Sequence, residues 1–166
     1  MKNNISIQDD VVVKKINKNF INISIEWFEF YKALAAKNKY LVKVLDIDIK
    51  RNILYMENLG NCIHTEACLK DPYLKNRATK ETVCDIIIAL NTAWSDSIEF
   101  SKSLQGNEFF VHTDLSLDNI VLTPDNKIKV IDPDSFQLID KLLYTEKFYM
   151  SQINLMANLG IYYNDL

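Results

Sequence analysis

The sequence predicts an α+β fold, with a small antiparallel sheet and one helix in its first half and mostly helices in its second. Three observations lead to this expectation. Short runs rich in Val and Ile flank a single amphipathic stretch in the first half, a polar break lies at 58–61, and the strongest helical periodicity follows at 79–101. The 166 residues fit one domain or one compact pair of lobes and exclude a multidomain array.

Composition excludes several classes of protein. Hydrophobic residues make up 48% of the chain and charged residues 25%, which is ordinary for a globular protein with a packed core. The net charge of -3 argues against a dominant nucleic-acid-binding surface, so we expect no nucleic-acid partner. No apolar run approaches the ~20 residues of a membrane span. The first residues lack the apolar core of a secretory signal, so we expect a cytoplasmic protein without a membrane partner.

The first half alternates strand and helix signals. Residues 11–13 are β-branched and suit a strand, and residues 5–7 are a candidate remnant strand before it. In the stretch 24–38 apolar residues recur at steps of three and four, which predicts a helix with its first residue, a serine, as N-cap. Two further strands are expected over 41–49 and 52–57, joined into a hairpin by a charged turn.

The second half is expected to be mostly helical, with a few short strands. Its longest periodic stretch has apolar residues at helical spacing over about six turns, which predicts one long helix. The expected elements are a turn or helix start at 71–72, the long helix at 79–101, a strand at 109–111, a hairpin formed by 120–122 and 128–131, and one or two helices from Ser135 onward.

A polar segment lies between the expected strand at 109–111 and the hairpin that follows it. Asp114 and Asn119 belong to this segment, and Asp132 follows the second strand of the hairpin. Because a hairpin returns its second strand beside its first, we expect Asn119 and Asp132 to approach each other. Oxygen-bearing side chains at the open end of a hairpin suit a hard divalent cation such as magnesium, together with a general base.

The spacing of these residues resembles that of the protein-kinase-like superfamily. The pattern His112-x-Asp114-Leu-x-x-x-Asn119 matches the family's catalytic loop, and Asp132 follows at the interval of its metal-binding aspartate. The loop motif alone is moderately specific. Together with the predicted hairpin and the correctly spaced aspartate, it becomes a strong signal.

The first half carries further parts of the resemblance. Val12-Val13-Lys14 is similar to the family's Val-Ala-Ile-Lys strand, and Glu29 lies inside the helix that follows. Residues 53–59 resemble the strand that leads into the hinge, with Met56 as gatekeeper. These segments occur in the family's order, so the resemblance covers most of the chain.

The resemblance implies a truncated two-lobed protein-kinase-like fold, with an N-lobe at 1–57 and a shortened C-lobe at 58–166. It also implies a phosphotransferase that uses ATP and magnesium and moves the γ-phosphate to an acceptor hydroxyl. By this resemblance, Lys14 would bind phosphate and pair with Glu29, and adenine would bind at Met56 and to backbone groups of Glu57 and Leu59. Asp114 would accept a proton, and His112 would support the loop. Asn119 and Asp132 would bind magnesium, with Asp134 as a candidate further ligand.

The sequence also departs from the family pattern. Only 13 residues precede Lys14 and none of them is glycine, so we expect the glycine-rich lid to be missing or supplied by a partner chain. Asp132-Pro133-Asp134 replaces Asp-Phe-Gly, and the part that docks peptide substrates is expected to be truncated. Ser116 stands where protein Ser/Thr kinases usually carry lysine; the branch that resembles aminoglycoside and choline phosphotransferases tolerates other residues there.

Several alternatives stay open on the sequence alone. Lys15 competes with Lys14 and Glu26 competes with Glu29, although strand alternation allows only one of the two lysines to face the cleft. The chain is either an active enzyme or a pseudokinase that binds a nucleotide or a protein without turnover. The retained Asp114 favours the enzyme, because a base matters only to turnover. A homodimer or a partner protein is a candidate cover for the cleft, and the acceptor is a protein or a small molecule.

Overall fold

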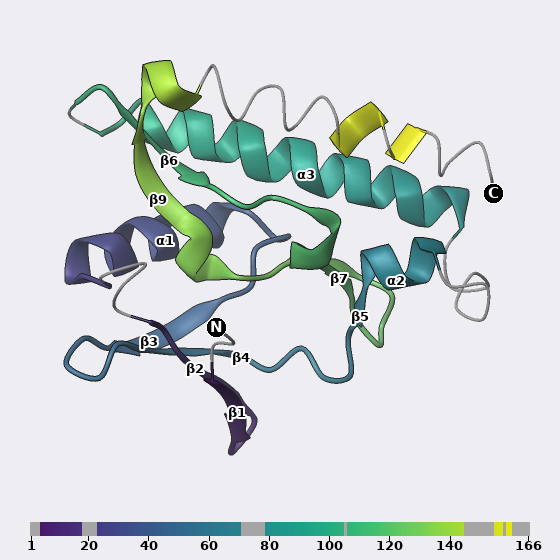
Figure 1. Cartoon of the computed structure of the whole chain (residues 1–166), viewed down its shortest axis with the longest axis horizontal. Helices are drawn as coiled ribbons and strands as arrows, with labels where there is room; N and C mark the ends of the chain where they lie inside the picture. Colours follow the sequence, from purple (N-terminus) through teal and green to yellow (C-terminus); the bar gives the residue numbers. More distant parts are fainter. Residues whose placement is uncertain are drawn as a thin grey trace.

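The computed structural model describes residues 4–17, 23–70, 79–104, 106–144, 155–157 and 159–160. Within these ranges the fold is mixed α/β, with small antiparallel sheets and two longer helices (Figure 1). The predicted α+β class is confirmed as far as the mixture of helices and small antiparallel sheets is concerned. No helix in the described ranges is long and apolar enough to span a membrane. The predicted turn or helix start at 71–72 lies outside the described residues.

A four-stranded antiparallel sheet forms the first half. Its strands are β1 (Asn4–Gln8), β2 (Val11–Lys15), β3 (Val44–Asp48) and β4 (Ile53–Glu57), in the order β1-β2-β4-β3. The candidate strand at residues 5–7 and the predicted hairpin are therefore confirmed. The strand expected from residue 41 begins three residues later, because Leu41 and Val42 contact Val130 in the second half of the chain. The Val42 N–H donates to the Val130 carbonyl at 3.0 Å.

Helix α1 (Ile25–Lys37) packs one aromatic face into the core. Ser24 caps it by accepting a hydrogen bond from the Trp27 N–H at 3.0 Å, as the sequence predicts. Trp27 and Tyr31 lie one turn apart and stack with ring centroids 5.4 Å apart. The fully buried Tyr31 hydroxyl donates to the Val42 carbonyl at 2.6 Å. Burial raises the pKa of Tyr31 well above its usual value, so the hydroxyl keeps the proton that it donates.

The second half is built on the long helix α3 (Lys80–Ser101), whose N-terminus is closed by a capping box between Thr79 and Thr82. Its buried residues recur at the spacing that the sequence predicts. The other elements before residue 132 are β5 (Ile63–His64), α2 (Thr65–Lys70), β6 (Glu108–His112), the 3₁₀ turn η2 (Leu117–Asn119), β7 (Ile120–Leu122) and β8 (Ile128–Val130). Strands β5, β7 and β8 form a three-stranded sheet, which confirms the predicted hairpin.

The helix predicted from Ser135 onward is wrong for its first part. The 3₁₀ turn η3 (Pro133–Ser135) leads into strand β9 (Phe136–Asp140), which pairs with β6 in an antiparallel two-stranded sheet. The reason is tertiary pairing: β6 needs a partner, and Phe136 fills the space beside the Tyr31 ring, 1% exposed. Residues 141–144, 155–157 and 159–160 are helical, and Leu159 is fully buried.

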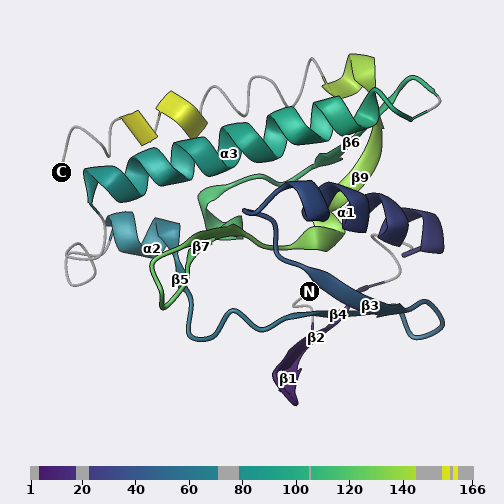
Figure 2. The same cartoon turned by 180° about the vertical axis from the view of Figure 1, so that it is seen from behind.

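The elements are arranged in layers. Helix α3 runs along one side and the four-stranded sheet lies on the other, with α1, the β6–β9 pair and the β7–β8 hairpin between them; the hairpin of β1 and β2 projects from the far side (Figures 1 and 2). The loops that follow β6 and β8 therefore lie in the middle layer, between α3 and the inner face of the sheet.

Replacement of Tyr31 by phenylalanine is expected to lower the free energy of unfolding by about 1–2 kcal/mol, because it leaves the buried Val42 carbonyl without its hydroxyl donor. Urea unfolding followed by circular dichroism measures the change. Tyr55→Phe on the half-exposed face of β4 is the matched control and is expected to cost less than about 0.5 kcal/mol. Equal losses in the two variants would contradict the assigned role of the Tyr31 hydroxyl.

Candidate functional site

The candidate site is centred on a buried lysine held between two aspartates. Lys14 lies on β2 opposite Leu54 and is 1% exposed, whereas Lys15 points outward and is exposed. The Lys14 Nζ is 2.7 Å from the Asp132 Oδ1 and 2.5 Å from the Asp134 Oδ1. Folding thus joins the first half of the chain to a segment about 120 positions later.

The chain turns sharply at Asp132, so that both carboxylates face the lysine. Asp132 adopts a left-handed conformation with φ 63° and ψ 56°, which aspartate tolerates better than most residues. The next residue is Pro133, which opens η3 at a position where its missing N–H does no harm. The Ser135 N–H donates to the Asp132 carbonyl at 2.9 Å and closes the turn. The two aspartates are therefore presented by fixed backbone.

The β7–β8 hairpin brings Asn119 to the same region. The Ile131 N–H donates to the Asn119 carbonyl at 2.8 Å, so the backbones on either side of the hairpin's open end are in contact, as its topology predicts. The Asn119 Nδ2 donates to the Asp114 carbonyl at 2.6 Å and to the Asp114 Oδ2 at 3.0 Å. Asn119 is buried and Asp114 is exposed, so the amide orients a carboxylate that solvent and an acceptor can reach.

His112 is a support of the loop rather than an acid or base. It is 7% exposed, its Nε2 is 3.1 Å from the Ile131 carbonyl, and its Nδ1 accepts the Asp114 N–H at 3.3 Å. These two bonds fix the neutral tautomer that carries its proton on Nε2. Burial lowers the pKa of His112, which keeps it neutral at pH 7.

The buried centre holds one more carboxylate than ammonium groups among its described residues. Two carboxylates share one ammonium, and burial raises the pKa of Asp134 although Lys14 opposes this rise. Within the described ranges no three His, Cys, Asp or Glu side chains gather as a metal cage. Asp132 and Asp134 carry the kind of oxygen that magnesium takes from a protein, one or two carboxylates with phosphates and water completing its shell, and in this structure an Oδ1 atom of each contacts Lys14.

The structure does not bring Glu29 to Lys14. Glu29 is exposed, because the buried face of α1 is the one that carries Trp27 and Tyr31. Its competitor Glu26 is exposed as well. The predicted ion pair between Lys14 and Glu29 is therefore replaced by the pairing of Lys14 with the two aspartates.

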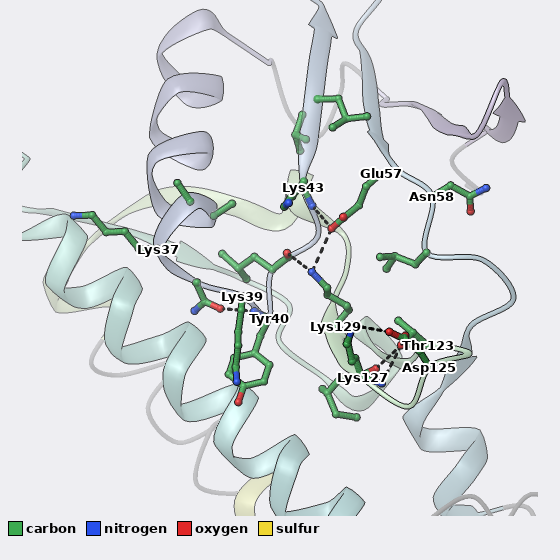
Figure 3. Close-up of a pocket in the computed structure, with 18 of the residues that line it drawn as sticks. Lys37, Lys39, Tyr40, Lys43, Glu57, Asn58, Thr123, Asp125, Lys127 and Lys129 are labelled. Atoms are coloured by element: carbon green, nitrogen blue, oxygen red, sulfur yellow. Dashed lines mark hydrogen bonds and ion pairs between the residues drawn. The ribbon is translucent and has the colours of Figure 1, made fainter.

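The residues predicted to bind adenine are divided between two environments. Met56 is 7% exposed and belongs to the core, on the same face of the sheet as Lys14. The Glu57 N–H donates to the Lys43 carbonyl at 3.0 Å. The side chain of Glu57, together with Leu59, lines an open cleft to which Lys14 does not contribute (Figure 3). The structure thus places Met56 with Lys14, but Glu57 and Leu59 on another cleft.

The position of the aspartate segment also depends on a contact that the sequence motifs do not reveal. The Trp27 Nε1 donates to the Phe136 carbonyl at 2.8 Å, which ties α1 to the end of η3. Helical spacing marks Trp27 as a packing residue, but no local signal identifies its backbone acceptor 109 positions away. Trp27 is thus a positioning residue for the segment that carries Asp132 and Asp134.

Replacement of Lys14 by methionine is expected to lower the free energy of unfolding by about 3–5 kcal/mol, because the Asp134 carboxylate, whose side chain is 8% exposed, loses its counter-charge. The loss is expected to be smaller at pH 5 than at pH 8, since a raised pKa lets Asp134 take up a proton. The variant Lys14→Met/Asp134→Asn is expected to recover part of the stability, and Lys15→Met is the control with little effect. No recovery in the double variant would refute the assigned pairing.

The stability of the fold is expected to fall as the pH drops from about 6.5, the usual pKa of histidine in an unfolded chain. Burial lowers the pKa of His112 in the folded state, so the unfolded state binds its proton first and acid favours unfolding. His112→Gln is expected to flatten this dependence between pH 7.5 and 5.5, measured by urea unfolding. His64→Gln, at the exposed histidine, is the control; an equal flattening there would contradict the assignment.

Comparisons with known proteins show only a distant likeness. No protein-family model matches the chain, and no curated protein sequence matches it. Among solved structures it is similar to a choline/ethanolamine kinase family protein from Mesorhizobium loti, at 12% identity and a TM-score of 0.48, over 84% of this chain and 57% of that one. It is also similar to choline kinase LicA from Streptococcus pneumoniae, at 15% identity and a TM-score of 0.48, over 97% of this chain and 70% of that one. The chain thus spans little more than half the length of the Mesorhizobium loti protein, and the likeness assigns it neither a family nor an activity.

Proposed function

We propose that the protein is a minimal ATP- and magnesium-dependent phosphotransferase that moves the γ-phosphate to an acceptor hydroxyl. The observation that carries the proposal is the buried contact of Lys14 with Asp132 and Asp134. It supports the role that the motif spacing implies, because a cation, two carboxylates and the Asn119–Asp114 pair then belong to one region. The proposal includes a two-lobed kinase-like arrangement, divided at residues 57 and 58, and a cytoplasmic location.

Each residue of the site has a role in this proposal. Asn119, Asp132 and Asp134 would hold magnesium, which neutralises the charge that develops on the transferred phosphoryl group. Lys14 would exchange its carboxylate partners for the α- and β-phosphate oxygens, to which an ammonium binds as a point charge. The adenine ring of ATP would lie against the segment from Met56 to Leu59.

Asp114 is the proposed proton acceptor. It is exposed, and the two hydrogen bonds from Asn119 fix its backbone and carboxylate. It would accept or orient the proton of the attacking hydroxyl, with His112 holding the loop from behind. The acceptor is a protein or a small molecule, and a homodimer or a partner protein is proposed to cover the open side of the site.

A pseudokinase is the second candidate, and one observation favours it. The Lys14 ammonium is paired with the two carboxylates that magnesium would need. Glu29 is exposed and does not compete with them for an ion pair with Lys14. In that case the protein binds a nucleotide or a partner without turnover. Thermal unfolding tests the metal role: a larger stabilisation by ATP with magnesium than by ATP alone supports metal binding by Asp132 and Asp134. Turnover of ATP separates the two candidates.

The replacement Asp114→Ala is expected to reduce ATP-dependent phosphorylation of an acceptor by about 100-fold or more, because it removes the general base. Labelled ATP with a panel of protein, sugar, aminoglycoside and choline-type acceptors measures the activity. The matched control is Asp118→Ala, an exposed aspartate of the same loop, which is expected to keep the wild-type rate. Lys14→Ala is expected to weaken nucleotide use more than Lys15→Ala. Tight nucleotide binding with no turnover on any acceptor would favour the pseudokinase.

A further inference from the structure

An open cleft lies outside the Lys14 centre, beside the end of β4. Its volume is about 1210 Å³, and it is bordered by the C-terminal end of α1, the start of β3, the residues after β4 and the turn between β7 and β8 (Figure 3). Glu57 and Leu59, which are predicted to contact adenine through their backbone, line it; Lys14, the residues predicted to bind magnesium and the predicted proton acceptor do not. It therefore needs a physical explanation of its own.

The lining of this cleft is strongly basic. Among the described residues, six lysines and three carboxylate residues border it, which leaves an excess of three formal positive charges. The lysines are Lys32, Lys37, Lys39, Lys43, Lys127 and Lys129, and the acids are Glu57, Asp85 and Asp125. In a protein of net charge -3, this concentration of positive charge on one hollow is a local exception. A concave, charged wall focuses the field and raises the local concentration of anions.

Only part of this charge is neutralised within the protein. The Lys129 Nζ lies 3.3 Å from the Glu57 Oε1, and the Lys127 Nζ lies 2.6 Å from the Asp125 Oδ2 (Figure 3). The other four lysines have no carboxylate within ion-pair distance in the described part of the chain. Lys39 lies over the Tyr40 ring, 5.0 Å from its centroid, which leaves its charge available to an anion.

The shape of the cleft and its apolar residues favour an acidic peptide over a single phosphate group or a single-stranded nucleic acid. Its volume exceeds the ~300–1,000 Å³ typical of small-molecule pockets, and its lysines come from separate elements, so they do not converge as a single phosphate site requires. Leu45 is 50% exposed at its edge, and Ala35, Leu59 and Ile128 also line it. Among the described residues that line it, Tyr40 is the one aromatic side chain, whereas single-stranded nucleic acids are bound by several stacking rings.

We propose that this cleft binds an acidic, apolar-rich peptide segment of a partner protein. Carboxylates of the segment would contact the unpaired lysines, above all Lys39 and Lys43, and its apolar side chains would cover Ala35 and Leu45. The carboxylates of Glu57 and Asp125 keep two of the lysines paired and so limit the number of acidic side chains that the cleft accepts. The proposal does not depend on phosphotransferase activity.

The test uses the full chain and a fluorescein-labelled peptide of sequence DLEDLEDIE, with anisotropy as the readout. The expected result is saturable binding that weakens with added salt. The uncharged analogue NLQNLQNIQ is expected to bind at least about 10-fold more weakly. No binding of the acidic peptide below about 1 mM would overturn the proposal. Tighter binding of polyphosphate or of a single-stranded oligonucleotide to the same lysines would overturn the choice of a peptide.

Two variants of equal net charge locate the binding. Lys39→Glu/Lys43→Glu is expected to weaken peptide binding about 10-fold or more, because each change removes an attraction and adds a repulsion. Lys15→Glu/Lys50→Glu changes exposed lysines outside the cleft and is expected to bind the peptide within about twofold of the wild type. Both variants are first compared with the wild type in thermal unfolding. Equal losses of affinity in the two variants would show unspecific attraction and refute the cleft as the site.

Discussion

The contact of Lys14 with Asp132 and Asp134 is the constraint on which the rest of the structure depends. An ammonium that is 1% exposed is costly unless it is paired. Its partners lie about 120 positions away, so the pairing can form only when β2 and the segment after β8 have reached their final places. Buried ion pairs often contribute little net stability compared with apolar residues of similar volume. Packing alone would therefore not require this arrangement.

Two supports hold the aspartates in front of the lysine. One is aromatic: the Tyr31 and Phe136 rings meet edge to face, and the indole of Trp27 donates to the Phe136 backbone. The other is the β7–β8 hairpin, which fixes Asn119 and Ile131 by one backbone hydrogen bond. Because one support comes from α1 and the other from the hairpin, the site is positioned by regular elements on both sides. This is the kind of preorganisation that phosphoryl transfer needs, since its catalysis is largely positioning and charge stabilisation.

Local patterns predicted the parts of the fold that local physics determines. The boundaries of α3, the cap at Ser24 and the β7–β8 hairpin follow from periodicity, capping and turn residues. Strand β9 was missed because its strand conformation depends on pairing with β6, which no pattern within 136–140 encodes. The site was predicted in the same way. Loop spacing pointed to Asp114, Asn119 and Asp132. The predicted pairing of Lys14 with Glu29 does not occur, because the aromatic core sets which face of α1 is buried and Glu29 lies on the exposed face.

Strand β4 separates two regions of opposite charge. Alternation along the strand places Met56 on the face that Lys14 shares, where carboxylates are in excess, and Glu57 on the face of the basic cleft. The Lys129–Glu57 pair then joins the end of β4 to the middle of β8, and Asn119 lies at the open end of the same β7–β8 hairpin. Because Glu57 keeps Lys129 paired, this contact holds the hairpin against the sheet whether or not an anion lies in the cleft. The two regions therefore share one structural element while their charges stay on opposite faces of β4.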